Sequence, residues 1–294
     1  TKKHCIWKRT LYCLVAAALI VSVEPKALSL NVVKADTNTK TIVNSKVASS
    51  KKFSAKLKGD ILKIKKGADK TDIQICEPQL FKVDYKPGGK SSKDTLVVDS
   101  NKKWSKVKIE ASDLKSDPMV IKTQKMVLEI NKTDLSISVY DLQGKLLLKQ
   151  DSIASKSVCF THNFGDRFYG VNGYNVGDDS SKGMLRTGNT SVYAGYQGHC
   201  GAPFIWSNDG YGVLVDSDGG NFSIGDTVLS YNGDSKDDID YYVMVGSPKE
   251  VMSEEADVSG KAPMFPKWAT GFTNTQWGWD NSLSGTGTDE DKLK

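Results

Sequence analysis

Residues 204–215 read Phe-Ile-Trp-Ser-Asn-Asp-Gly-Tyr-Gly-Val-Leu-Val and predict a β-hairpin. Apolar runs at 204–206 and 213–215 flank an Asn-Asp-Gly turn. Asn, Asp and Gly readily adopt the backbone conformations that tight turns between strands require. This stretch therefore indicates two paired strands of an antiparallel sheet.

Similar short strands recur along the chain. Residues 120–148 alternate apolar with polar or smaller side chains, with a turn at 141–144, as expected for half-buried strands. Trp104, Val107 and Ile109 alternate with lysine and predict a further strand. No helical period of ten or more residues occurs before residue 247. We therefore expect a mainly β protein, with an antiparallel β-sandwich at residues 53–246.

A helix is predicted after the sandwich. Ser247-Pro-Lys-Glu250 has the form of a capping box with proline at the first helical position. Gly260 fits the end of the helix, and Pro263 and Pro266 prevent its continuation. Residues 247–266 are therefore expected to form a linker helix and a proline-rich connection, followed by a strand at 268–277.

The first 35 residues have the pattern of a secretory signal peptide. Lys2, Lys3, Lys8 and Arg9 precede an apolar run at 11–23, and small residues end the segment at Ala35. The run is short for a membrane span, although an uncleaved anchor is the alternative. We expect export to the cell surface or medium, with no membrane attachment after cleavage and a flexible, solvated lead-in at 36–52.

Charge is divided unevenly along the chain. Residues 36–133 carry 22 basic and 12 acidic side chains, whereas residues 134–294 carry 12 and 22. The basic part contains no arginine and no basic motif interleaved with aromatic residues, so no nucleic-acid partner is expected. A solvated lysine surface is the simpler interpretation.

Cysteine and histidine are too few to define a scaffold or a metal site. Outside the leader, Cys76, Cys159 and Cys200 allow one disulfide at most, and the sequence does not choose the pair. His162 and His199 lie in no metal-binding context and are expected to be ordinary loop residues. We expect no metal and no cofactor.

Several motifs occur in the order found in one enzyme family. They are Phe168-Tyr-Gly-Val-Asn-Gly173, the 201–217 strand pair, Asp240-Tyr-Tyr242, the capping box, and Pro266-Lys-Trp-Ala269. Together they resemble glycoside hydrolase family 31, which includes α-glucosidases, α-xylosidases and α-galactosidases, over residues 55–280. Gly173, where the family has glutamate, and residues 274–278 depart from the family pattern and leave the substrate preference open.

The resemblance implies a galactose-mutarotase-like β-sandwich, a linker helix and the first strand of a truncated (β/α)₈ barrel at 267–294. It also implies a retaining O-glycosyl hydrolase whose two catalytic carboxylates lie on later barrel strands. No catalytic residue is therefore assigned in this chain, which we expect to be an inactive fragment of a carbohydrate-metabolising enzyme.

The family also implies a sandwich loop that contacts an α-linked oligosaccharide or glycoconjugate. The matching region is 172–189, and its polar candidates are Asp178, Asp179, Arg186 and Asn189. Carboxylates accept hydrogen bonds from sugar hydroxyls, and arginine donates in a fork; a solvated turn is the alternative.

Trp277 and Trp279 are candidates for stacking on a sugar, with packing between domains as the alternative. Asp209 and Asp216 are expected to shape turns.

Two other functions remain open from the sequence. The first is a stand-alone carbohydrate-binding β-sandwich, which should end at a closed strand. The second is a sugar mutarotase or epimerase, which requires a positioned acid and base. The sequence does not indicate the oligomeric state.

Overall fold

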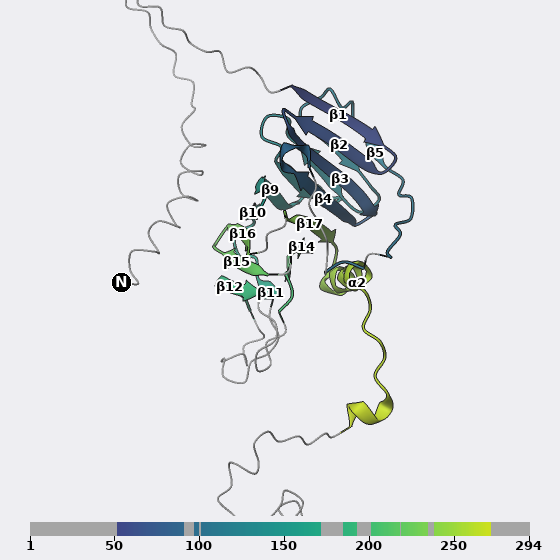
Figure 1. The fold of residues 1–294 in the computed structure, drawn as a ribbon, viewed down its shortest axis with the longest axis vertical. Helices are drawn as coiled ribbons and strands as arrows, with labels where there is room; N and C mark the ends of the chain where they lie inside the picture. The colour runs from purple at the N-terminus through teal and green to yellow at the C-terminus, as the bar shows by residue number, and fades with distance from the viewer. Residues whose placement is uncertain are drawn as a thin grey trace, which may run out of the picture. The chain divides into compact units, whose positions relative to one another are not determined.

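The computed structural model describes residues 52–90, 97–99, 101–171, 185–192, 201–217, 219–234 and 238–271. Within these ranges the chain is mainly β, with two antiparallel sheets and one α-helix (Figure 1). The expected leader at 1–35 and nearly all of the lead-in lie outside the described residues. So do residues 272–294, most of the expected start of the barrel.

The first sheet has eight strands, with the order β1-β2-β3-β4-β17-β14-β13-β11. In this order the strands are β1 (Phe53–Lys58), β2 (Ile61–Lys66), β3 (Asp69–Glu77), β4 (Leu80–Lys86), β17 (Asp240–Val245), β14 (Tyr211–Asp216), β13 (Phe204–Ser207) and β11 (Phe168–Gly170). The Asn-Asp-Gly hairpin is confirmed as β13–β14, in which Phe204 pairs with Leu214. Strand β17 inserts beside β4, so the C-terminal part of the sheet completes its N-terminal part.

The second sheet has nine strands, with the order β12-β15-β16-β10-β9-β8-β7-β6-β5. In this order the strands are β12 (Gly188–Val192), β15 (Gly220–Ile224), β16 (Val228–Gly233), β10 (Ser157–His162), β9 (Leu146–Ala154), β8 (Ile137–Tyr140), β7 (Val127–Ile130), β6 (Met119–Lys122) and β5 (Glu110–Ala111). The alternation at 120–148 is confirmed as the meander from β6 to β9.

The strand predicted around Trp104 is largely wrong. Val107 and Ile109 do turn toward the core, but only Glu110 and Ala111 pair with β6. Side-chain alternation therefore does not establish that a neighbouring strand exists to accept hydrogen bonds.

The main core lies between the inner faces of the two sheets. Alternate residues point into it, such as Leu62 and Ile64 from β2 and Leu128 from β7. The rings of Phe160 on β10 and Tyr241 on β17 meet edge to face at 5.3 Å and join the sheets. Burying each such aromatic side chain contributes about 2–3 kcal/mol.

Helix α2 (Pro248–Ser259) packs on the outer face of the eight-stranded sheet (Figure 1). Its capping box is confirmed: Ser247 Oγ accepts from the Glu250 amide, and Glu250 Oε2 accepts from the Ser247 amide at 2.8 Å. Gly260, with φ 101°, ends the helix. Val251 and Val258 are the buried residues through which it contacts the sheet.

Two short 3₁₀ helices, η1 (Pro87–Gly89) and η3 (Lys267–Thr270), complete the elements of the described chain. A strand starting at Trp268 is therefore a wrong prediction over its first three residues. Extended Pro266 instead leads into a single turn, in which Thr270 Oγ1 donates to the Lys267 carbonyl at 2.7 Å. The rest of the predicted strand lies outside the described residues.

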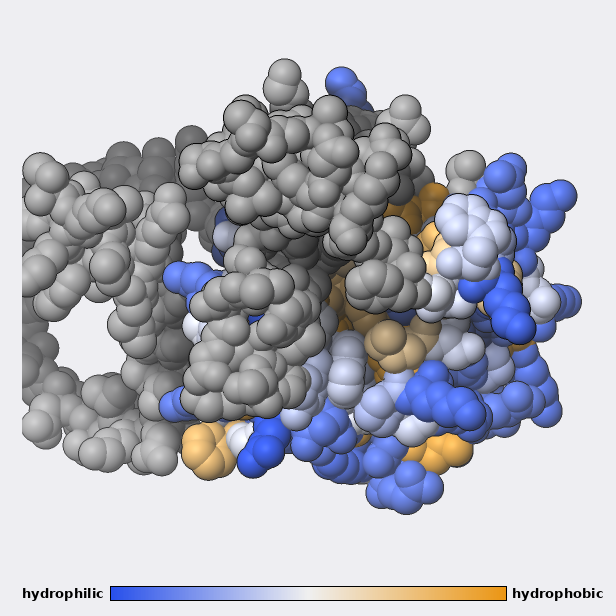
Figure 2. Space-filling view, turned by 90° about the horizontal axis from the view of Figure 1, so that it is seen from below, coloured by the Kyte–Doolittle hydropathy of each residue, from blue (hydrophilic) through white to orange (hydrophobic). Residues whose placement is uncertain are grey.

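Hydrophilic side chains cover much of the coloured face in Figure 2. Within the described ranges, no helix has the length and apolar character that crossing a membrane would require.

Candidate functional site

The two ends of the predicted sugar loop meet at β11. The amide of Arg186 donates to the Phe168 carbonyl at 2.8 Å, and its Nε donates to the Gly170 carbonyl at 2.8 Å. These two bonds fasten the chain entering β12 to the chain leaving β11. Arg186 therefore joins the described residues on either side of segment 172–184.

A constrained backbone turn follows β11. Gly170 has φ 102°, and a Cβ atom there would lie 2.6 Å from the Phe204 carbonyl oxygen, so only glycine fits. Val171 has φ 67°, which costs a β-branched residue about 1–3 kcal/mol. Its amide donates to Phe204 O at 2.8 Å, and its carbonyl accepts from Ala202 N at 2.7 Å. The point where the chain leaves the sheet is thus fixed by packing and hydrogen bonds.

A buried polar cluster of His162, Asp166 and Tyr211 supports β11 from inside the sandwich. The Tyr211 hydroxyl donates to Asp166 Oδ2 at 2.7 Å, and His162 Nδ1 lies 3.6 Å from the same oxygen. The ring of Phe168 on β11 meets the His162 ring edge to face at 4.8 Å. The cluster therefore links β10 and β14 to the strand from which segment 172–184 departs.

Both ring nitrogens of His162 face acceptors. Nδ1 lies 2.9 Å from the Asn163 carbonyl oxygen and Nε2 lies 3.2 Å from that of Gly225. Burial alone would lower the pKa of His162, but the hydrogen bonds to Asp166 and Asn163 outweigh it and raise the pKa. Burial, reinforced by Asp166, raises the pKa of Tyr211. His162 is therefore a buried structural residue, and its description as an ordinary loop residue is wrong.

An aromatic pair occupies the opposite face of β11 and β13. The rings of Tyr169 and Trp206 stack with centroids 4.6 Å apart and planes inclined by 24°. Both side chains are half-buried, and Trp206 packs against the smaller apolar cluster beneath α2. A partly exposed flat pair of this kind can contact the apolar face of a sugar ring.

The structure describes only two of the six predicted substrate-binding residues. Arg186 is half-buried at the base of the loop, whereas Asn189 is exposed within β12, opposite Ser223. The predicted loop therefore ends before Gly188, where pairing with β15 begins. Further predicted residues lie outside the described ranges, namely Asp178, Asp179, Trp277, Trp279, His199 and Cys200.

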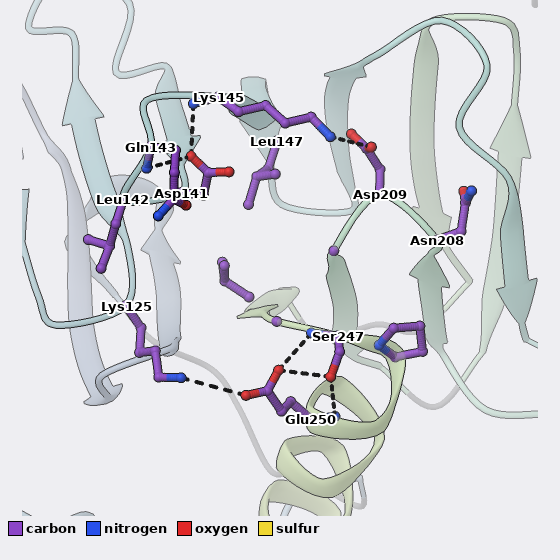
Figure 3. Close-up of a pocket in the computed structure, with 14 residues that line it drawn as sticks. Lys125, Asp141, Leu142, Gln143, Lys145, Leu147, Asn208, Asp209, Ser247 and Glu250 are labelled. Carbon is purple, nitrogen blue, oxygen red and sulfur yellow. Dashed lines mark hydrogen bonds and ion pairs between the residues drawn. The ribbon is translucent and has the colours of Figure 1, made fainter.

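An open groove of about 620 Å³ lies between turns at one end of the sheets and the start of α2 (Figure 3). Lys145 pairs with Asp209 across it, and Lys125 Nζ lies 3.6 Å from Glu250 Oε1. Asp209 also accepts from Asn163 Nδ2 at 2.9 Å, which confirms a structural role in its turn. Four charged side chains of this groove are thus paired with one another, and Asp141 accepts from the amides of Gln143 and Lys145.

Sequence reasoning missed both the buried His162 cluster and the Tyr169–Trp206 stack. Tyr211 lies 45 or more positions from Asp166 and His162, and Tyr169 lies 37 positions from Trp206, so only the sheet order brings these partners together. Among the residues that the structure describes, Cys76 is a free thiol, and no group of three or more His, Cys, Asp or Glu side chains could hold a metal ion.

No family model matches the chain. Among curated proteins it is similar to a 1,6-alpha-glucosyltransferase of Sporosarcina globispora, with 35% identity over 246 residues, covering 76% of this chain and 19% of that protein. It is also similar to an alpha-xylosidase of Saccharolobus solfataricus, with 33% identity over 118 residues, covering 37% of this chain and 16% of that protein.

Solved structures share the fold. A GH31 dextranase of Flavobacterium johnsoniae complexed with glucose matches with TM-score 0.61 and 20% identity, over 75% of this chain and 29% of that one. A GH31 alpha-xylosidase from a soil metagenome, complexed with xylose, matches with TM-score 0.63 and 19% identity, over 74% of this chain and 36% of that one.

These matches agree with the motif order found in the sequence. The chain spans about a fifth of the length of the curated relatives it matches. Over that span, the chain is related to the enzymes of glycoside hydrolase family 31.

Proposed function

We propose that this chain is the N-terminal part of an exported, retaining enzyme that hydrolyses terminal α-linked sugars. The observation that carries the proposal is the 35% identity over 246 residues to an enzyme named for α-1,6-glucosyl transfer, of which the chain spans 19%. In this proposal the sandwich corresponds to residues 53–246, the connection to 247–266, and the start of the barrel to 267–294.

The chemistry requires two carboxyl groups about 5–5.5 Å apart. One attacks the anomeric carbon to form a glycosyl ester while the other protonates the leaving oxygen; water then cleaves the ester. We place both groups beyond residue 294, so residues 36–294 should not release nitrophenol from nitrophenyl α-glucoside or α-xyloside. The protein encoded by the extended reading frame should do so, and turnover by residues 36–294 alone would refute this placement.

Transfer is a second candidate, because the relative that is 35% identical is named a glucosyltransferase. A sugar hydroxyl would then replace water: the ester bond breaks, a new bond forms from C1 to the acceptor oxygen, and the acceptor's proton passes to the carboxylate that had acted as acid. Incubating the extended protein with maltose and following products by chromatography separates the two. Longer oligosaccharides indicate transfer, and glucose alone indicates hydrolysis.

We further propose that the sandwich contributes substrate contacts through Arg186 and segment 172–184, including Asp178 and Asp179. The two bonds from Arg186 to β11 support this role, since they fix where the segment leaves the sheet. In the extended enzyme, Arg186→Ala should raise KM at least about tenfold, the loss of about 1.4 kcal/mol of binding. Exposed Arg167→Ala is the matched control and should leave KM unchanged; an equal effect of both variants would contradict the role.

Asn189, Trp277 and Trp279 remain candidate contacts of the same kind. Each alanine variant is expected to affect KM more than kcat if it removes uniform substrate binding. An unchanged KM would remove that residue from the proposed site.

A stand-alone carbohydrate-binding module is the alternative favoured by the stacked Tyr169–Trp206 pair. Calorimetric titration of this chain with isomaltotriose tests it: saturable binding lost in Tyr169→Ala supports a module, and no heat of binding argues against it. A mutarotase is less well supported, because an acid or base must reach the sugar. His162 is buried, with both ring nitrogens facing carbonyl oxygens.

Export through residues 1–35 is proposed from the sequence pattern alone. A reporter fused after Ala35 should be secreted, and N-terminal sequencing of the secreted product should begin at Asp36. Retention of the reporter in the cell would contradict the proposal.

A further inference from the structure

Exposed lysines gather on the outer face of the eight-stranded sheet at its β1 end. On β1–β3, alternate residues such as Leu62 and Ile64 point into the core, so the intervening side chains point outward. Five exposed lysines occupy these outward positions and define the lysine face: Lys56, Lys58, Lys63, Lys65 and Lys70.

The strand register places these charges against one another. Lys56 lies directly opposite Lys63, and Lys65 lies directly opposite Lys70. Like charges at directly opposed positions destabilise a sheet. The face therefore carries an electrostatic cost that the fold does not require.

Few anions of the described chain offset this cost. Asp72 Oδ2 lies 3.7 Å from Lys63 Nζ but closer, at 2.9 Å, to Lys86 Nζ. Lys70 Nζ donates to the Gly89 carbonyl at 3.3 Å. Within the described ranges, Lys56, Lys58 and Lys65 form no ion pair.

Protection of the sheet edge explains only part of the pattern. Lysines on an edge strand discourage pairing with another chain, and β1 is the edge strand here. Lys63, Lys65 and Lys70 lie on β2 and β3, whose edges are already paired. Their clustering is better explained by a partner that neutralises them.

We propose that the lysine face binds a flexible linear polymer that carries phosphate groups and no bases. Side-chain attachment points on one face of a sheet repeat at about 6.7 Å along a strand and about 4.8 Å between strands, so lysines at these positions suit a chain of closely spaced charges. Lysine binds phosphate as a point charge and needs no fixed orientation of the anion, as suits a flexible chain, whereas the planar fork of arginine suits carboxylates and phosphates held in one orientation. Residues 53–77, which form β1–β3, contain no arginine.

The absence of outward aromatic residues on β1–β3 separates this partner from nucleic acid. Single-stranded nucleic acids are held by bases stacked on aromatic side chains as well as by charge. The outward positions of β1–β3 carry lysine, serine, isoleucine, aspartate, glutamine and cysteine. The face can neutralise a backbone but has nothing on which a base could stack.

The test uses inorganic polyphosphate as the probe and the full chain as the protein. The face variant carries Lys56→Gln, Lys63→Gln, Lys65→Gln and Lys70→Gln. The matched control carries Lys103→Gln, Lys106→Gln, Lys108→Gln and Lys115→Gln, which removes the same charge from other exposed positions. Circular dichroism and thermal melting establish that both variants are folded; Lys65→Gln with Lys70→Gln is the milder substitute if the face variant is not.

Four neutralised phosphates predict a slope of about −3 for log K against log salt concentration. Binding should weaken at least tenfold in the face variant and by less than twofold in the control. Equal losses in both variants, or no binding at low salt, would overturn the proposal.

Two further outcomes would also overturn it. Tighter binding of a single-stranded oligonucleotide than of polyphosphate with equal charge would show that bases are recognised. Self-association at low salt that disappears in the face variant would show that the partner is the acidic part of a second copy.

Discussion

Lys82 Nζ lies 2.6 Å from Asp240 Oδ2, and this ion pair joins β4 to β17 on the outer face of the eight-stranded sheet. Asp240 lies directly opposite Asp84 on one side and Asp216 on the other. A row of carboxylates thus crosses adjacent strands, and Lys82 supplies a compensating charge. Lys82 therefore offsets the repulsion between Asp240 and the acidic side chains on the neighbouring strands.

Lys82→Met should destabilise the fold by about 3 kcal/mol, because it leaves a buried carboxylate without its cation. The Asp240 side chain is only 6% exposed, so solvent screens its charge poorly. Urea unfolding at pH 7 measures the loss. Lys63→Met is the matched control: its partner Asp72 is 3.7 Å away and Lys63 is half exposed, so a loss under about 1 kcal/mol is expected.

Glu254 on α2 should weaken the fold when it ionises. Its Oε2 is buried without a hydrogen-bond partner among the described residues, and Oε1 accepts from Gln79. Burial raises its pKa, with further contributions from the charges of Glu77 and Asp257. A carboxyl whose pKa is raised on folding stabilises the fold at low pH, and this stability is lost as the pH rises through the raised pKa.

Glu254→Gln should therefore raise the free energy of unfolding at pH 7 by about 1 kcal/mol and leave it nearly unchanged at pH 4. Urea unfolding at the two pH values tests this difference. Glu255→Gln, which removes the same charge from the same helix, should not reproduce it. A loss of stability in Glu254→Gln at pH 7 would show that the ionised form is the one the fold favours.

His162 should stabilise the sandwich in its protonated form. Folding raises the pKa of His162. Its contribution to stability is therefore complete below the pKa in the unfolded chain, about 6.5, and is lost as the pH rises through the pKa in the folded protein. The melting temperature should accordingly fall as the pH rises above about 6.5. Asp166→Asn removes the carboxylate that holds the proton, so its melting temperature should fall less over this range; an unaltered pH profile would contradict the pairing.

The features that were predicted correctly from the sequence are those that local patterns determine. The 208–210 turn, the 120–148 alternation and the Ser247–Glu250 capping box each depend on neighbouring residues, and the structure has all three. The insertion of β17 beside β4 and the His162–Asp166–Tyr211 cluster depend on sheet order, which no short window contains. The strand predicted from Trp268 is wrong, because an aromatic residue two positions after Pro266 suits a turn as well as a strand.

The contact between α2 and β14 depends on the absence of a side chain at Gly212. A Cβ atom there would lie 2.5 Å from Val251 Cγ1, the residue through which α2 approaches the strand. Gly212→Ala should therefore destabilise the fold by about 1–3 kcal/mol, through overpacking. Adding Val251→Ala removes the clashing methyl groups, so the double variant should be more stable than the sum of the two single changes predicts, with a coupling of at least about 0.5 kcal/mol. Strict additivity in urea unfolding would show that the helix is not held against β14 at this point.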